Sequence, residues 1–165
     1  MKKDILWAPW RIKYIQGKKK RGCIFCAAIK GKRNSVIIKN KHSFSMLNAF
    51  PYNNGHVMVS PKRHESELEN LNEKEILDLF NTLIETKKLI DKLLKPHGYN
   101  LGINLKQASG AGVTGHLHIH LVPRWRADTN FMGVCANTKV ISQSLNELYS
   151  KLKNAHAKSD KRVRR

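Results

Sequence analysis

The chain has 165 residues, of which 41% are hydrophobic, so it is long enough to bury one core and too apolar for a disordered chain. No apolar run reaches the roughly 18–20 residues of a membrane span, and the first residues lack the apolar stretch of a signal peptide. With 31 Lys and Arg against 12 Asp and Glu, the formal net charge is +19. These properties argue against a secreted or membrane protein, and we expect a cytoplasmic one.

The positive charge is concentrated at the two ends of the chain. Residues 1–41 carry 13 bases and one acid, residues 151–165 carry 7 bases and one acid, and residues 42–150 carry 11 bases and 10 acids. Basic ends favour polyanions such as nucleic acid, or they are simply solvated charged segments. We divide the chain into a Trp-containing basic arm (1–22), one domain (23–152) and a mobile basic tail (153–165).

Short apolar runs predict five strands, and two segments predict helices. The strands are expected over 36–38, 44–47, 56–60, 99–105 and 116–122, with Pro61 and Pro123 ending two of them. Asn72 is the predicted N-cap of one long helix that stops before Pro96 and Gly98. Its apolar stripe consists of Ile76, Phe80, Leu83, Ile90 and Leu94. With a second helix over about 140–152, these elements indicate an α+β fold with an antiparallel sheet.

The cysteines favour a metal site. Three are present, and an odd number argues against a disulfide framework. Cys23 and Cys26 form a Cys-x-x-Cys pair that follows a basic run and Gly22 instead of a strand, so metal is a better interpretation than a redox motif. One pair supplies only two ligands, and the others must come from elsewhere in the chain. A metal-free pair of thiols is the alternative.

A row of three histidines, His116, His118 and His120, alternates with apolar residues. Alternate residues of a strand share one face, about 6.5–7 Å apart, so the row presents three imidazoles together. Three interpretations are open: hydrogen-bonded imidazoles, ligands of one zinc ion, or a nucleophile that attacks phosphate while a neighbour fixes its tautomer. The preceding Gly-rich loop, 104–115, favours the last, because backbone N–H groups at glycines can approach an anion closely.

These motifs together resemble the histidine triad (HIT) family. Residues 116–122 match its His-φ-His-φ-His-φ-φ pattern, residues 53–64 resemble its upstream strand, and 23–26 resembles its zinc-binding members. The segments 6–11, 123–125, 128–131 and 139–141 resemble a narrower branch, the prokaryotic diadenosine tetraphosphate phosphorylases of the triad type. The resemblance spans about 4–152 and implies a HIT-like fold of about five strands with one long helix and a C-terminal helix.

The resemblance also implies a role for each site residue. His118 would be the nucleophile, with its second ring nitrogen on a main-chain carbonyl, that of His120 or a neighbour, and His120 and His56 would line the phosphates. The expected substrate-binding residues are Asn104, Ser109, Gly110, Gly112 and Thr114. Many triad proteins carry Ser or Gln just before the motif, whereas this chain has Ala-Gly-Val at 111–113. Side-chain contact with the leaving group therefore comes from Ser109 or Thr114, or is absent.

For metal, the resemblance implies a closed, structural zinc site, so that His116 is not catalytic. Its ligands would be Cys23, Cys26, His64 and His116. It also implies a homodimer or homotetramer, in which Trp7, Trp10 and Trp125 are candidates for subunit contact or adenine stacking.

The expected activity is cleavage of diadenosine tetraphosphate with phosphate to give ADP and ATP. One alternative is a triad hydrolase that releases AMP from dinucleotides or nucleoside phosphoramidates. Another is a nucleic-acid-binding or DNA-adenylate-processing protein that uses the basic ends. The histidine in third position, His120, distinguishes the chain from triad relatives with Gln there, and does not separate phosphorylase from hydrolase.

Overall fold

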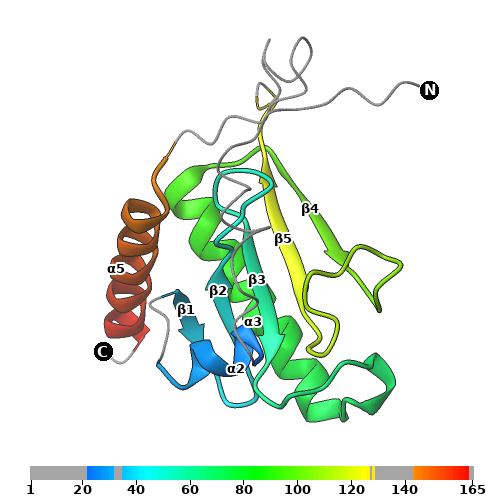
Figure 1. Cartoon of the computed structure of the whole chain (residues 1–165). Helices are drawn as coiled ribbons and strands as arrows, with labels where there is room; N and C mark the ends of the chain where they lie inside the picture. The colour runs from blue at the N-terminus through cyan, green and yellow to red at the C-terminus, as the bar shows by residue number, and fades with distance from the viewer. Residues whose placement is uncertain (1–21, 32–34, 127, 129–142, 164–165) are drawn as a thin grey trace, which may run out of the picture.

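The computed structural model describes residues 22–31, 35–126, 128 and 143–163, with side chains described to residue 158 in the last segment. Most of the predicted arm, with Trp7 and Trp10, lies outside these residues, as does Cys135. Within them the chain forms a five-stranded antiparallel sheet in the order β1-β2-β3-β5-β4 (Figure 1). The strands are β1 (Val36–Lys39), β2 (Ser43–Leu47), β3 (Val57–Pro61), β4 (Gly98–Ile103) and β5 (Ile119–Arg124). The helices are α2 (Ile24–Ile29), the 3-10 turn η1 (Leu68–Asn70), α3 (Glu73–Leu94) and α5 (Leu145–Val163).

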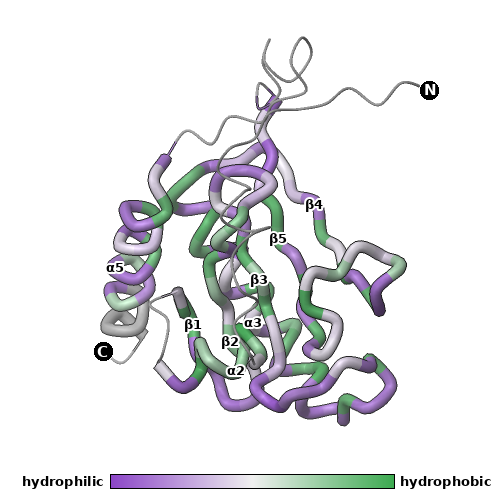
Figure 2. Tube along the Cα trace, viewed as in Figure 1, coloured by the Kyte–Doolittle hydropathy of each residue, from purple (hydrophilic) through white to green (hydrophobic). Residues whose placement is uncertain are grey.

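This arrangement confirms the predicted α+β fold. The sheet separates two apolar clusters, because successive side chains of each strand point to opposite faces. On one face the sheet packs against α3 and α5, and that cluster includes Val57, Val59, Leu83, Leu121 and Leu148. On the other face α2 covers the sheet, and that cluster includes Phe25, Ala28, Phe44, Met46 and Met58. Figure 2 shows hydrophobic residues along the central strands and mostly hydrophilic ones on α5.

Both predicted ends of the long helix are confirmed. The Asn72 side chain accepts a bond from the Glu75 N–H at 3.0 Å, and the Glu75 carboxylate accepts one from the Asn72 N–H at 3.1 Å. This reciprocal capping box satisfies two backbone donors that a helix start leaves unpaired. The helix ends at Leu94, and Lys95 follows in the left-handed conformation with φ 46°, just before Pro96.

The predicted apolar stripe of α3 is only partly correct. Of its five residues, Leu83 and Ile90 are buried, whereas Ile76 and Phe80 are 41% and 50% exposed. The helix is rotated so that Thr82 faces the sheet, where its hydroxyl lies 2.7 Å from Ser43 Oγ and accepts a bond from the Asn40 amide. The buried side of α3 therefore contains polar residues that a search for hydrophobic spacing does not select.

Strand β5 also differs from its predicted bounds. It begins at Ile119 instead of His116, and it continues through Pro123 to Arg124. Pro123 is tolerated because its carbonyl points away from β4 and accepts a bond from the Asn53 side chain. On that side β3 pairs with β5 only as far as Leu121, so none of the described strands faces Pro123 there. Its missing N–H points to that same side, so no ladder hydrogen bond is lost.

The predicted tail begins inside a helix, because residues 153–163 continue α5. The helix begins at Leu145, later than predicted, and its apolar spacing places Leu148 and Leu152 in the core. Contacts persist beyond residue 152, since the Lys153 ammonium donates to the Ile37 carbonyl at 3.3 Å and Ala155 packs on the core. Among the helices that the structure describes, none is both long and apolar enough to cross a bilayer.

Candidate active site and metal cluster

The histidine row lies on the sheet face covered by α2 and divides into two groups. His116 faces the cysteines, while His118 and His120 lie toward His56 of the turn before β3. All four imidazoles are buried. Backbone pairing fixes this placement, because His120 lies opposite Met58 in the β3–β5 ladder.

His118 has the hydrogen bonding that a neutral nucleophile requires. Its Nδ1 lies 2.9 Å from the carbonyl oxygen of His116. Because a carbonyl only accepts, Nδ1 carries the proton and Nε2 keeps its lone pair. Burial lowers the pKa of His118, which favours this neutral form. The carbonyl belongs to His116, two residues earlier, where the resemblance implied that of His120 or a neighbour.

A chain of three groups sets the tautomer of His120. The backbone N–H of Tyr52 donates to His56 Nδ1 at 3.0 Å, so His56 holds its proton on Nε2. That Nε2 lies 2.9 Å from His120 Nδ1 and donates to it, which leaves the proton of His120 on its own Nε2. Burial and the neighbouring imidazoles lower the pKa of His56 to about 3 and that of His120 to about 4. His120 is therefore a neutral N–H donor beside His118.

Three neighbours of these histidines were not predicted as site residues. The buried Asn48 amide nitrogen lies 3.2 Å from His56 Nδ1, and the Tyr52 ring is centred 4.6 Å from the His56 ring. Phe25, on α2, has its ring centroid 4.8 Å from that of His118. A six-residue helix is too short for periodicity to reveal, and Asn48 and Tyr52 lie in a turn whose composition shows only that it is a turn.

Four donors converge at the other end of the row, as the resemblance implied. The donor atoms of Cys23, Cys26, His64 and His116 all lie within 4.8 Å of one another. Cys23 Sγ is 3.2 Å from His116 Nδ1, and Cys26 Sγ is 3.3 Å from His64 Nδ1 and 3.7 Å from His116 Nδ1. Bonds of about 2.0–2.3 Å in a tetrahedron give edges of about 3.3–3.8 Å, so this set could hold one metal ion.

The surroundings of the four donors also suit a metal. His116 Nε2 lies 2.9 Å from the Pro61 carbonyl, so that nitrogen carries the proton and Nδ1 is free to coordinate. Burial raises the pKa of the Cys26 thiol, and the neighbouring Cys23 raises it further. A bound cation would have the opposite effect, because it favours the thiolate.

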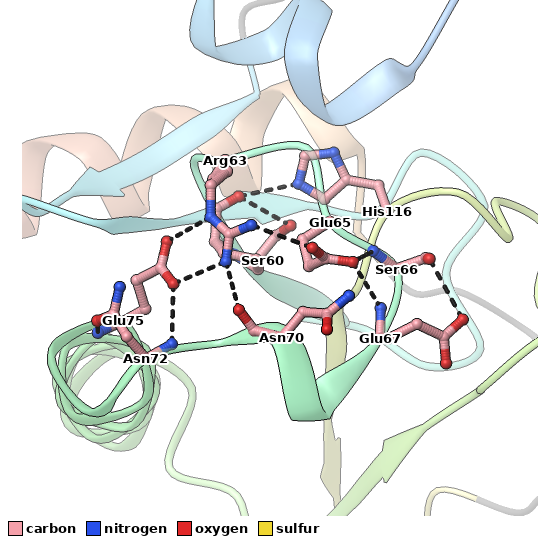
Figure 3. A network of polar contacts seen from close by, with 10 residues as sticks. Ser60, Arg63, Glu65, Ser66, Glu67, Asn70, Asn72, Glu75 and His116 are labelled. Atoms are coloured by element: carbon pink, nitrogen blue, oxygen red, sulfur yellow. Dashed lines mark hydrogen bonds and ion pairs between the residues drawn. The ribbon is translucent and has the colours of Figure 1, made fainter.

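A polar network holds the loop that carries His64 (Figure 3). Arg63 donates to both carboxylate oxygens of Glu75 at 2.8 and 2.9 Å, and also to Glu65 and the Asn70 carbonyl. The Arg63 guanidinium lowers the pKa of Glu75 to about 2. The Leu117 N–H donates to the Glu65 carbonyl at 2.6 Å, so this loop is fixed to α3 on one side and to the histidine row on the other.

The predicted substrate-binding residues all lie in the loop between β4 and the histidine row. Asn104 is half-buried, and Ser109, Gly110, Gly112 and Thr114 are exposed. Ser109 Oγ donates to the Lys106 carbonyl at 2.8 Å, so its proton is used within the loop. Gly110 adopts φ 85°, which glycine supports without strain.

Two further observations concern residues near this loop and site. Val113 packs against the cluster around Phe25, which brings the loop toward α2. The Trp125 indole N–H donates to the Leu94 carbonyl at 3.3 Å, so this residue is anchored at the end of α3.

Comparison with known proteins gives a family. The HIT domain model matches residues 30–127. An AP-4-A phosphorylase of Mycobacterium tuberculosis is 35% identical over 153 residues, which are 86% of this chain and 78% of that protein. The adenosine 5'-monophosphoramidase HNT1 of Candida albicans is 30% identical over 145 residues, 84% of this chain and 93% of that protein. A Zn-bound histidine triad family protein from Mycobacterium smegmatis has the same fold, with a TM-score of 0.68 at 24% identity, over 85% of this chain and 96% of its own. The chain belongs to the HIT domain family.

Proposed function

We propose that this protein is a nucleotidyltransferase that cleaves diadenosine tetraphosphate with phosphate as acceptor. The observation that carries the proposal is the tautomer of His118, whose Nδ1 is held by the His116 carbonyl so that Nε2 can attack. The likeness to an AP-4-A phosphorylase over 86% of the chain supports the substrate class. Phosphate as acceptor, and release of ADP and ATP, complete the proposal.

The reaction follows from the two imidazoles. His118 Nε2 attacks the α-phosphorus, a P–N bond forms, and the P–O bond to the β-phosphate breaks so that ATP leaves. The imidazolium formed at His118 is stabilised by the His116 carbonyl on its Nδ1–H. His120 donates its Nε2–H to the phosphoryl oxygens, where negative charge develops. An oxygen of inorganic phosphate then attacks the same phosphorus, the P–N bond breaks, and ADP forms.

The loop before the triad is the proposed phosphate contact. Gly110 and Gly112 would offer backbone N–H groups to the phosphates, and Asn104 and Thr114 would offer side-chain donors. Ser109 would contribute only if its hydroxyl left the Lys106 carbonyl.

We propose that the four-donor cluster holds a structural zinc ion. Two thiolates and two imidazoles are the donor types that zinc prefers, and four protein ligands leave no position for a water. The ion would fix α2 against the sheet, and every step of the reaction uses His118, His120 and their hydrogen-bond partners. Metal analysis should find about one zinc per chain. A purified protein that stays metal-free after zinc is supplied would contradict this assignment.

The test of the activity is incubation with diadenosine tetraphosphate, with and without phosphate, followed by chromatography of the products. ADP plus ATP only when phosphate is present is the expected result, and AMP plus ATP regardless of phosphate would show a hydrolase. The likeness to an adenosine 5'-monophosphoramidase makes phosphoramidate hydrolysis the second candidate. Adenosine 5'-phosphoramidate is therefore assayed in parallel, and faster turnover of it would overturn the dinucleotide assignment.

A further inference from the structure

A hollow of about 340 Å³ lies next to the triad on the same face of the sheet. Its lining residues are Tyr52, Asn100, Val122 and Arg124. Val122 and Arg124 follow His120 at alternate positions of β5, and Asn100 lies opposite Val122 on β4. The hollow therefore extends the histidine row beyond His120, away from the end that the cysteines occupy. Its volume is at the lower end of the range for small-molecule pockets, about 300–1,000 Å³.

Tyr52 joins the hollow to the triad. Its ring centroid is 4.6 Å from that of His56 and 5.7 Å from that of His120, yet the residue is 59% exposed. One part of the ring covers the two imidazoles, and the rest is open. An exposed aromatic ring beside a phosphate-binding site offers a face on which a nucleobase can stack.

Arg124 gives the hollow a flat, nearly neutral wall. Asp128 accepts from its Nε at 2.5 Å and from its Nη2 at 3.1 Å, and the Asn100 side-chain oxygen accepts from its Nη1 at 2.8 Å. The carboxylate compensates the charge and holds the guanidinium plane in place. A compensated, fixed guanidinium attracts a phosphate less than a free one does, but it still offers a planar surface for a base.

We propose that this hollow binds the second nucleoside of the substrate, the one carried by the leaving nucleotide. The inference rests on the proposed function and adds the residues that select a dinucleotide. Four residues of extended chain from His118 to Val122 span about 13 Å, so several phosphates must separate a base in the hollow from the reacting phosphorus. An aromatic ring, a planar guanidinium, the Asn100 amide and the apolar Val122 together match a nucleobase, and the phosphates between would lie over His120.

The experiment compares diadenosine tetraphosphate with adenosine 5'-tetraphosphate, which has the same reacting phosphate and lacks the second nucleoside. Wild type should prefer the dinucleotide in kcat/KM by about 10-fold, as expected for one stacked base. Tyr52→Leu removes the ring and keeps the backbone donor to His56, and Asn100→Phe fills the hollow. Asn100→Phe should lower kcat/KM for the dinucleotide about 10-fold and change that for the mononucleotide less than twofold. Tyr52→Leu should lower the ratio of the two kcat/KM values about 10-fold. Leu101→Ala, the exposed neighbour on the opposite side of β4, is the control and should change neither.

Two results would overturn the inference. If Tyr52→Leu lowers turnover of both substrates equally, the ring acts on the histidines, and if neither variant alters the preference, the hollow is not used. Binding to His118→Ala separates this inference from the proposed function, because it requires no turnover. Calorimetry should show about 10-fold tighter binding of the dinucleotide to His118→Ala, and the double variant with Tyr52→Leu should lose that advantage. Equal affinities of His118→Ala for the two compounds would refute the second-nucleoside site even if wild type cleaves both.

Discussion

Three imidazoles of the site have their tautomers set by a backbone group. The His116 carbonyl places the proton of His118 on Nδ1, the Pro61 carbonyl places that of His116 on Nε2, and the Tyr52 N–H keeps His56 Nδ1 unprotonated. Since carbonyls only accept and amide N–H groups only donate, each of these contacts is compatible with one tautomer of its neutral imidazole. His118 therefore has a free lone pair on Nε2, from which we propose attack, and His116 has one on Nδ1, to which we propose metal binding.

Replacing His118, the proposed nucleophile, should abolish turnover without unfolding the protein. His118→Ala removes the attacking nitrogen, and we expect kcat/KM to fall at least about 1,000-fold. Its ring contacts Phe25 and His120, and neither belongs to the large core cluster under α3, so the far-UV circular dichroism should be unchanged. His156→Ala, on α5, is the matched control. Substantial turnover by a folded His118→Ala protein would exclude the covalent mechanism.

Acid should destabilise the protein through the buried pair His56 and His120. Their pKa values of about 3 and about 4 lie below the ordinary value near 6.5, so the unfolded chain binds more protons between these limits. The free energy of unfolding therefore falls as pH falls from about 6.5 toward 4, and above 6.5 this contribution is constant. His120→Gln should flatten the profile, measured by urea unfolding at several pH values. An equally steep profile in the variant would contradict the assignment.

At the scale of secondary structure, the sequence predicted those elements whose signal is local. The capping box of α3 and the alternating strands follow from neighbouring residues, so Asn72, β2 and β3 lie where expected. Tertiary contacts decide the rest. The side of α3 that carries Thr82 faces the sheet, where Thr82 hydrogen-bonds with Ser43. Pro123 stays within β5 because β3 does not extend far enough to pair with it.

The candidate site was predictable where its residues share one motif. The Cys-x-x-Cys pair and the histidine row are visible in sequence, and the resemblance to the HIT family joined them to His64 and His56. The hollow was not predictable, because Tyr52, Asn100 and Arg124 come from three separate elements and no single motif joins them. Only the pairing of β4 with β5 brings Asn100 next to Arg124.

Helix α2 should depend on the metal cluster for its position. Cys23 is the N-cap of α2 and Cys26 lies in its first turn, and of its apolar residues only Phe25 and Ala28 are fully buried. Cys23→Ser should lower metal content and thermal stability more than it lowers kcat, because no reacting group is lost. Hydrogen exchange should increase first in α2. Cys135→Ser is the control, and a Cys23→Ser protein with unchanged stability and zinc content would contradict a structural site.

At the scale of the whole molecule, α3 presents an apolar surface to solvent. Ile76, Leu77, Phe80 and Ile84 are each between 41% and 64% exposed and lie on one side of the helix. A contiguous exposed apolar patch is typical of an interface, and we expect a second copy of the chain to cover it. Phe80→Glu should reduce the mass measured by light scattering, whereas Lys39→Glu, at an exposed position of β1, should not. A monomeric wild type at micromolar concentration would refute this prediction.

The basic end of the chain should contact polyanions without taking part in the reaction. Deleting residues 159–165 removes four bases and one acid, so the net charge falls by 4 − 1 = 3, from +19 to +16. A cut at 153 would be less informative, because Lys153 and Ala155 contact the rest of the fold. Binding to duplex DNA should weaken, and the slope of log K against log salt should become shallower by about 0.9 for each DNA phosphate that the shortened chain no longer neutralises.

The matched control for that deletion replaces Lys74, Lys88 and Lys92 of α3 with Gln, which gives the same net charge of 31 − 3 − 12 = +16 at another surface. If the position of the charge matters, the deletion should weaken DNA binding more than the control does, and both should turn over dinucleotide like wild type. Equal weakening in the two variants would mean that only total charge attracts DNA. If the deletion also stopped dinucleotide turnover, the end of α5 would have to be part of the active site, since its removal leaves Leu148 and Leu152 in the core.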